Sequence, residues 1–79
     1  MEKFYTLNAL VEAIEDVLEL PYELNTKKEI QRLMDTKDFK KLTEAVLVYR
    51  KLDDNMYYTR DTLDTLIYLL AQQYEQQCS

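Results

Sequence analysis

The sequence predicts a mainly α-helical fold that carries one small β-hairpin. Apolar residues recur every three or four positions over 7–18 and again over 59–74, which is the period of an amphipathic helix. Two short runs rich in valine and tyrosine, at 45–52 and 56–59, flank an acidic turn and have the composition of paired strands. A two-stranded hairpin is barely stable alone in water, so we expect it to pack against the helices.

The first helix is expected over 7–18, with Thr6 as its N-cap. Six apolar side chains form its predicted buried stripe, namely Leu7, Leu10, Val11, Ile14, Val17 and Leu18. The opposite face is acidic and carries Glu12, Glu15, Asp16 and Glu19. Pro21 is expected to end this helix, because proline disfavours helical geometry in the residue before it.

The second helix begins with the letters TKKE, in which Thr26 and Glu29 match a capping box. Its expected buried residues are Ile30, Leu33 and Met34. Turn-forming residues at 35–38 then predict an interruption, followed by a third helix over 38–45. This third helix would turn Phe39 and Leu42 inward and Lys37, Lys40 and Lys41 outward. A single helix from 27 to about 45 is the alternative.

The hairpin is predicted from a first strand at 45–52, a turn formed by the letters LDDN, and a returning strand at 56–59. Aspartate and asparagine tolerate turn geometry, so the chain needs no glycine there. The last helix should start after Thr59, with Asp61 in its first turn. Its expected stripe contains Leu63, Leu66, Ile67, Leu70 and Tyr74. Tyr68 and Leu69 widen that stripe, which indicates either a homodimer through this helix or a cover over the hairpin and the first helix.

Charge is unevenly distributed along the chain, whose net charge is −5. Eight of the ten basic residues lie within 26–51, giving that segment a charge of +4, whereas 1–25 and 52–79 carry −5 and −4. Such asymmetry is typical of a surface that binds a polyanion. A solvated helix face of mixed charge is the alternative.

Several function classes are not expected. The chain has no histidine and no glycine, so we predict no enzyme, no cofactor and no metal site. No apolar run approaches the roughly 20 residues of a membrane helix, and the start lacks the plan of a signal peptide, so a cytoplasmic location without membrane contact is expected. The lone Cys78 reads as an incidental thiol, with intermolecular pairing as the alternative. The whole chain, 1–79, is expected to form one domain.

Two phrases resemble a known family. FYTLNALVEAI at 4–14 resembles the opening of MerR-type DNA-binding domains, and MYYTRDTLDTLIYL at 56–69 resembles the return of their wing into the next helix. Together they cover about 25 of 79 residues. The resemblance implies a winged helix-turn-helix with a three-helix core, a two-stranded wing and a C-terminal helix. The usual wing glycine is replaced at 53–55, and the long coiled coil and effector domain are missing, so the likeness points to excisionases and small regulators of phages and mobile elements.

This resemblance implies a DNA-binding protein without enzymatic activity, acting in transcription, excision or replication. The third helix would enter the major groove, with Thr43 and Lys37 near base edges. The tyrosines of the wing, Tyr49, Tyr57 and Tyr58, are expected to serve packing. The predicted DNA-contacting residues are Lys28, Arg32, Lys37, Lys40, Lys41, Thr43, Arg50 and Lys51.

A second function is a protein-docking module, acting as an accessory subunit of a larger replication or transcription enzyme. Asp53 and Asp54 favour it, because they would repel phosphate at the tip of the wing. The exposed tyrosines also suit it, since tyrosine is enriched at the centres of protein interfaces. A small inhibitor that mimics DNA with its acidic face is a third class, which the basic segment disfavours.

Overall fold

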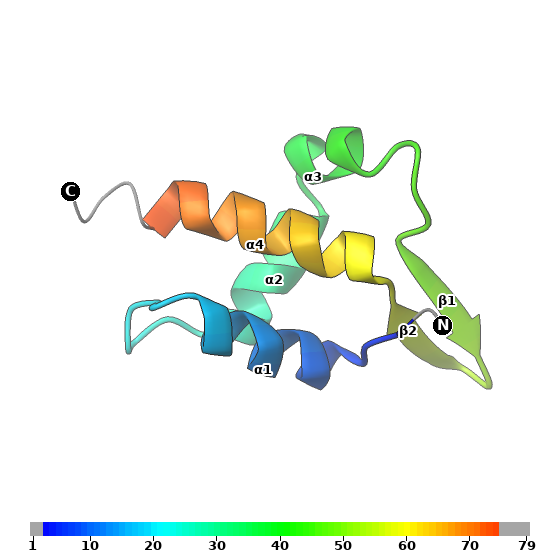
Figure 1. Cartoon of the computed structure of the whole chain (residues 1–79), viewed down its shortest axis with the longest axis horizontal. Coiled ribbons are helices and arrows are strands. Elements are labelled where there is room, and N and C mark those ends of the chain that lie inside the picture. The colour runs from blue at the N-terminus through cyan, green and yellow to red at the C-terminus, as the bar shows by residue number, and fades with distance from the viewer. Residues whose placement is uncertain (1–2, 75–79) are drawn as a thin grey trace.

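The computed structural model describes residues 3–74, and within them the chain forms four helices and one antiparallel hairpin (Figure 1). The predicted α-helical class with a small hairpin is therefore confirmed. Cys78 lies outside the described residues. The elements in chain order are α1 (Leu7–Val17), α2 (Thr26–Met34), α3 (Lys37–Leu42), β1 (Tyr49–Leu52), β2 (Asn55–Tyr58) and α4 (Arg60–Tyr74).

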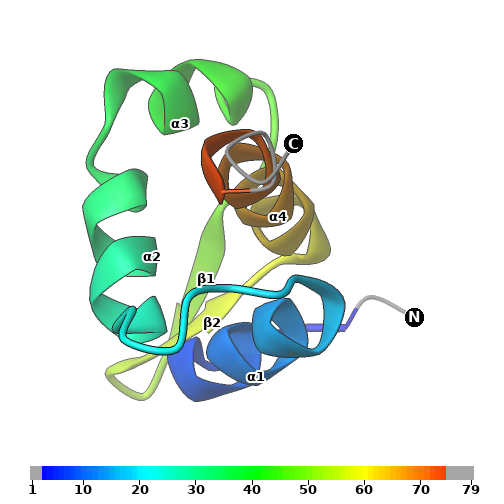
Figure 2. The same ribbon diagram turned by 90° about the vertical axis from the view of Figure 1, so that its left-hand side faces the viewer.

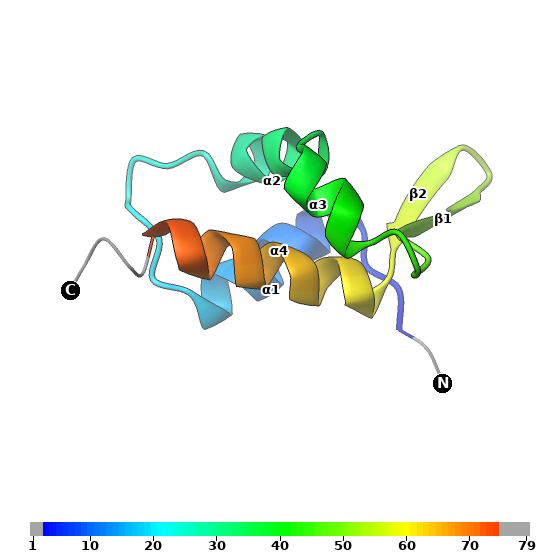
Figure 3. The same ribbon diagram turned by 90° about the horizontal axis from the view of Figure 1, so that it is seen from above.

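The core lies where α1, α2 and α3 surround α4, which Figure 2 shows end-on. Each helix sends apolar side chains into this space, because its hydrophobic residues repeat with the helical period. The side chains shielded completely from water include Leu10, Ile14, Ile30, Leu66 and Leu70. The hairpin projects beyond the helices at one end of the molecule (Figure 3).

Helix starts follow local capping chemistry. The Thr6 hydroxyl accepts a hydrogen bond from the Ala9 amide at 3.1 Å, as the sequence predicts. The cap of α2 differs, because Asn25 rather than Thr26 precedes the helix and accepts from the Lys28 amide. The predicted capping box at Thr26 is therefore wrong. Thr26 lies inside the helix, where it is buried and donates to the Glu15 carboxylate at 2.9 Å.

Two separate helices occupy 26–42, so the alternative of one continuous helix is wrong. Asp35 ends α2, and the Thr36 hydroxyl accepts from the Phe39 amide to start α3. The Thr36 hydroxyl also donates to the Leu33 carbonyl at 2.6 Å. Thr36 thus caps both the end of α2 and the beginning of α3. The interruption that the turn-forming residues at 35–38 indicated is confirmed.

Two residues of the predicted stripes are exposed. Val17 is 62% exposed and Leu42 is 50% exposed. The buried row of α1 is narrower than predicted and follows Leu10 and Ile14, continued by Leu18 at the C-cap, at a spacing of four residues. In α3, which has only six residues, Phe39 is the apolar side chain that reaches the core.

The first strand is shorter than the predicted 45–52, because it begins at Tyr49. Residues 43–46 form a turn, in which the Val46 amide donates to the Thr43 carbonyl. The opposing strand ends at Tyr58, after which the chain enters α4. Residues 45–48 consequently have no strand to pair with, despite their β-branched composition.

Hydrogen bonds at the base of the hairpin attach it to the helices. Tyr5, just before α1, exchanges two backbone hydrogen bonds with Tyr58, at 2.7 and 2.6 Å. On the other side, the Thr59 hydroxyl donates to the Leu47 carbonyl at 2.5 Å, and the buried Thr62 hydroxyl donates to the Val48 carbonyl at 2.6 Å. Threonines in the first turn of α4 therefore fix the chain that leads into β1.

The tip of the hairpin is a turn without glycine. Asp53 and Asp54 both have positive φ, 49° and 67°, as the central residues of a type I′ turn require. Aspartate is among the non-glycine residues that reach this region most readily. The predicted turn at 52–55 is confirmed.

Replacing Thr62 by valine should lower the free energy of unfolding by about 1 kcal/mol, because it removes a buried hydrogen bond while the side-chain shape is kept. Urea denaturation followed by circular dichroism measures this change. Thr65→Val is the matched control, since the Thr65 hydroxyl bonds within the helix to the Asp61 carbonyl beside solvent. Equal losses in the two variants would mean that the Thr62 bond does not hold the hairpin.

Candidate nucleic-acid interface

The exposed side of α3 is basic. Phe39 points into the core, and the helical period of 3.6 residues turns Lys37, Lys40 and Lys41 away from it. All three lysines are exposed, as the sequence predicts. The short helix therefore acts as a small platform, anchored by one aromatic ring, that presents three ammonium groups to solvent.

The two predicted basic residues of α2 have different surroundings. Lys28 is exposed in the first turn. Arg32 forms an ion pair with Glu29, one helical turn away, and donates to the Gln73 side chain of α4 at 3.3 Å. Its guanidinium is thus occupied by contacts within the molecule and is directed toward α4.

The hairpin separates its two basic residues, because side chains alternate between the faces of a strand. Lys51 shares a face with Tyr49 and is paired across the hairpin with Met56. Arg50 lies on the other face, where its guanidinium carbon is 5.8 Å from the centre of the Phe4 ring. The structure does not bring Arg50 and Lys51 together.

A groove of about 370 Å³ runs between the hairpin and the helices α2 and α3. Its floor and walls are mostly apolar, with Gln31 and Asp35 as polar residues on the α2 side. The elements that border it are those that carry Lys28, the three lysines of α3, and Lys51. The lining residues are Gln31, Met34, Asp35, Phe39, Val48, Tyr49, Met56 and Tyr58.

The sequence did not predict this groove. Met34 and Met56 lie 22 positions apart and line it from different elements, so no local pattern marks them. The one local signal was the excess of tyrosine in 49–58. Of these side chains, Tyr58 is buried and packs at a tilt of 58° against Tyr49, with ring centres 6.2 Å apart. Tyr49 itself is 44% exposed and available at the surface.

Burial and the neighbouring tyrosine both act on Tyr58. Burial has the larger effect and raises the pKa of the Tyr58 phenol, and the proximity of Tyr49 raises this pKa further. The ring therefore stays neutral at physiological pH and serves packing at the base of the hairpin, which matches the role expected from the sequence.

Thr43 does not fit the predicted role near base edges. Its side chain is only 5% exposed, and its hydroxyl donates to the Phe39 carbonyl at 2.8 Å. Thr43 is buried because it follows the last turn of α3 on the same side as Phe39, where it caps the helix end.

Most cations of this region have no carboxylate partner. Among residues 3–74, ion pairs up to 4.0 Å join only Arg32 to Glu29 and Arg60 to Asp64. Lys28, the lysines of α3 and Lys51 are thus balanced only at longer range, by exposed acids such as Asp35 and Asp38. Ammonium groups without an ion-pair partner therefore lie on three adjacent elements, within the segment 26–51, whose charge is +4 in a chain of net charge −5.

The outer face of α4 offers little to the predicted homodimer. Tyr68 is 52% exposed, but its hydroxyl accepts a hydrogen bond from Gln72 at 2.7 Å, and Asp61 and Asp64 share that face. Leu69 packs against the core instead. The exposed stripe is therefore polar along most of its length.

The described part of the chain also lacks two other kinds of site. In residues 3–74, no three acidic or sulfur side chains gather closely enough to hold a metal ion. Within the same range, no helix combines the length and apolar character needed to cross a membrane.

Comparisons with models of protein families, with curated proteins and with solved structures found no match to this chain.

Titration of Glu29 should report the ion pair on α2. The hydrogen bond from Arg32 holds the pKa of the Glu29 carboxyl below its usual value, with smaller contributions from Tyr74 and Gln73 and an opposing one from burial. Arg32→Gln should raise this pKa, as measured by NMR of the side-chain carboxyl carbon. An unchanged pKa would contradict the pairing.

The sign of the effect on stability follows from that shift. Because the folded pKa is depressed, the pair stabilises the fold above the unfolded pKa of glutamate, about 4.3. The contribution disappears as pH falls through the folded pKa. Arg32→Gln should consequently flatten the loss of stability in acid, which urea denaturation at several pH values measures.

Proposed function

We propose that this protein is a small, non-enzymatic DNA-binding protein with the layout of a winged helix-turn-helix. One observation carries the proposal: exposed lysines without ion-pair partners lie on α2, α3 and β1, the elements that border a single groove. The order of three helices, a hairpin and a last helix supports the winged-helix layout. The resemblance of both ends of the chain to MerR-type domains agrees with it.

The proposed contacts follow from where the cations lie. Lys37, Lys40 and Lys41 of α3 would bind phosphates along the major groove, and Lys28 would hold the backbone beside them. Helix α3 has six residues and is about 9 Å long, which fits within a major groove about 12 Å wide. Lys51 would reach the neighbouring phosphates from the wing. Gln31, which lines the groove of the protein, supplies an exposed side-chain amide that can form hydrogen bonds with a base edge.

Three residues of the predicted interface are left out of the proposed DNA contacts. Thr43 is buried, Arg32 is engaged by Glu29, and Arg50 lies on the far face of the wing. The proposed DNA contacts are therefore Lys28, Lys37, Lys40, Lys41 and Lys51. By the same resemblance, the protein would act as a regulator or as an excision or replication accessory of a phage or mobile element.

Binding to duplex DNA should weaken steeply with salt. If each of the five lysines neutralises one phosphate, the slope of log affinity against log salt is about −4.5. Replacing Lys40 and Lys41 by glutamine should reduce the magnitude of that slope by roughly 2, because two phosphate contacts are lost. Fluorescence anisotropy of a labelled duplex at several salt concentrations measures both slopes.

The matched control for this pair is Asn8→Asp combined with Gln72→Glu, which changes the net charge by the same amount. Both residues are exposed and lie on α1 and α4, away from the proposed interface. The control should keep the wild-type slope. If the two double variants lose affinity equally, the effect comes from net charge alone and the assigned surface is wrong.

Changes at the acidic tip of the wing should raise the affinity for DNA, whereas the lysine replacements should lower it. Asp53→Asn with Asp54→Gly places Asn-Gly, the sequence that type I′ turns prefer, at two positions whose φ is positive. The free energy of unfolding should rise by about 0.5–1 kcal/mol, because glycine carries no steric cost there. DNA affinity should rise as well, since two charges that repel phosphate are removed. Unchanged DNA affinity would mean that the tip does not approach the duplex.

A second function, docking on a larger replication or transcription protein, is favoured by the apolar character of the groove. Met34 and Met56 supply adaptable side chains, and the half-exposed Tyr49 is a residue type that anchors protein interfaces. The duplex titration separates the two functions. Affinity for DNA that is weak at low salt and insensitive to the lysine replacements would favour docking over DNA binding.

A further inference from the structure

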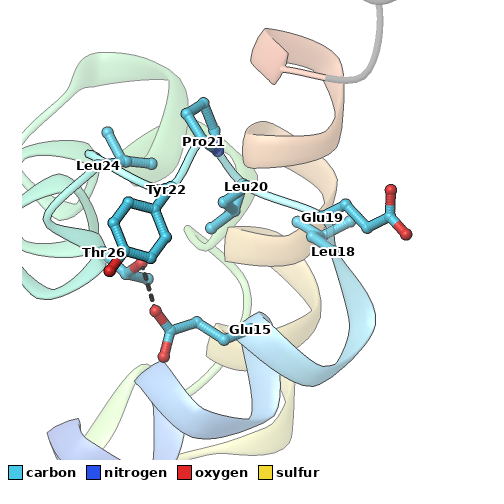
Figure 4. Close-up of a pocket in the computed structure, with 8 residues that line it drawn as sticks. All are labelled: Glu15, Leu18, Glu19, Leu20, Pro21, Tyr22, Leu24 and Thr26. Carbon is cyan, nitrogen blue, oxygen red and sulfur yellow. Dashed lines mark hydrogen bonds between the residues drawn. The ribbon is translucent and has the colours of Figure 1, made fainter.

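A second pocket lies at the other end of the molecule from the hairpin, where the chain passes from α1 to α2 (Figure 1). The molecule is 41 Å long, and the loop between α1 and α2 lies at the opposite end from the hairpin (Figure 1). The pocket measures about 460 Å³. Figure 4 shows its lining residues, which are Glu15, Leu18, Glu19, Leu20, Pro21, Tyr22, Leu24 and Thr26.

The chain turn that follows α1 produces this pocket. Helix α1 stops at Val17, and the Leu24 amide donates to the Pro21 carbonyl at 3.0 Å, which closes a tight loop. The loop leaves Leu20 and Leu24 half-buried and Tyr22 completely exposed. A complete tyrosine ring in water, beside a hollow with a leucine floor, is an arrangement that favours a partner.

The polar side of the pocket is acidic. The Thr26 hydroxyl, itself buried, donates to one oxygen of the Glu15 carboxylate at 2.9 Å and so orients that group (Figure 4). Glu19 also lines the pocket and points away from Glu15 (Figure 4). No basic residue lines it, and the segment 1–25 carries a charge of −5. Lys27 and Lys28 follow Thr26 directly, so the attraction for a cationic side chain comes from the two carboxylates of the pocket itself.

We propose that this pocket binds an arginine side chain of a partner protein, presented in a segment where leucine-like residues flank the arginine. The guanidinium would donate to the Glu15 carboxylate and stack on the Tyr22 ring, both of which suit its planar, charged shape. The aliphatic stem and the flanking side chains would cover Leu18, Leu20 and Leu24.

The arginine is expected to come from a different protein rather than from a second copy of this chain. Within residues 3–74 each arginine is engaged: Arg32 pairs with Glu29, Arg60 pairs with Asp64, and Arg50 lies over Phe4. The protruding hairpin of a second copy would bring its two aspartates to a pocket that is already acidic. The occupant is therefore a different protein, and its binding leaves the lysines of α3 and Lys51 free.

The test uses the full chain, labelled with ¹⁵N, and two peptides. Acetyl-Leu-Arg-Leu-amide is the probe, and the same peptide with citrulline in place of arginine has the same shape without the charge. Amide shifts at residues 18–26 should saturate with the arginine peptide. Affinity for the citrulline peptide should be lower by about tenfold or more, because a charge-assisted hydrogen bond is lost.

Glu15→Gln should weaken the arginine peptide by a similar factor. Its amide oxygen can still accept from Thr26, so the fold should be retained, which the spread of the amide spectrum verifies. Asp16→Asn is the matched control, because Asp16 is exposed on the same helix, changes the charge equally and does not line the pocket.

Three outcomes would overturn the proposal. The first is equal affinity for the arginine and citrulline peptides, and the second is equal weakening by the two α1 variants. The third is a set of shifts centred on the groove between α2 and the hairpin. Sedimentation without peptide tests whether the wild type associates with itself. If it does, and if Glu15→Gln abolishes that association, the occupant of the pocket is a second copy of this chain and not a partner protein. None of these measurements depends on DNA binding, so the two proposals can fail separately.

Discussion

The attachment of the hairpin to the first turn of α4 is the constraint on which the arrangement depends. A two-stranded ribbon of four residues per strand has little stability of its own, and both strands are largely exposed. The hydroxyls of Thr59 and Thr62 reach back to two consecutive carbonyls before β1, while Tyr5 pairs with the end of β2 from the other side. These bonds fix the direction in which the ribbon leaves the helices. The groove beside α2 depends on that direction, and on the core packing that places Tyr58 in the same buried cluster as Phe39.

Charge is organised around the same scaffold. A chain with net charge −5 could pair every lysine with a carboxylate, yet ion pairs in the described residues engage only two arginines. Exposed salt bridges contribute little to stability, so leaving lysines unpaired costs the fold almost nothing. Unpaired lysines nevertheless keep their full field for an incoming anion. Acids without basic neighbours in sequence lie on α1, on the loop after it and at the tip of the hairpin, where they would repel a polyanion and limit the orientations in which it can approach.

The sequence predicted the elements well and their surroundings poorly. Periodicity located α1 and α4, and Thr6, Thr59 and the Asp-Asp turn followed rules that act over three or four residues. The errors lie where tertiary contacts override local preference. Thr26 has the pattern of a cap, but the carboxylate of Glu15 engages its hydroxyl and Asn25 takes the capping position. Residues 45–48 have strand composition but no strand opposite them. Lysine exposure on α3 was predictable from a single aromatic anchor. The groove was not, because it is lined by residues from 31–39 and 48–58, which are distant in sequence. The acidic pocket comes from the single segment 15–26, but its shape depends on how the loop after α1 folds back, which no local pattern marks.

The two proposed sites attract opposite charges, and most of their residues lie at different ends of the molecule. A surface that attracts phosphate and a pocket that attracts arginine would neutralise each other if they lay side by side, because each would bind the other's charges within the molecule. The molecule is 41 Å long, about five Debye lengths at physiological ionic strength, so the direct interaction between exposed charges at its opposite ends is screened. Both ends can therefore remain unpaired in one small fold. If both proposals hold, an occupant at one end would leave the other accessible, and the chain would join an anionic surface to a cationic one. The packing of α1 against α4 would then set the distance between the two partners.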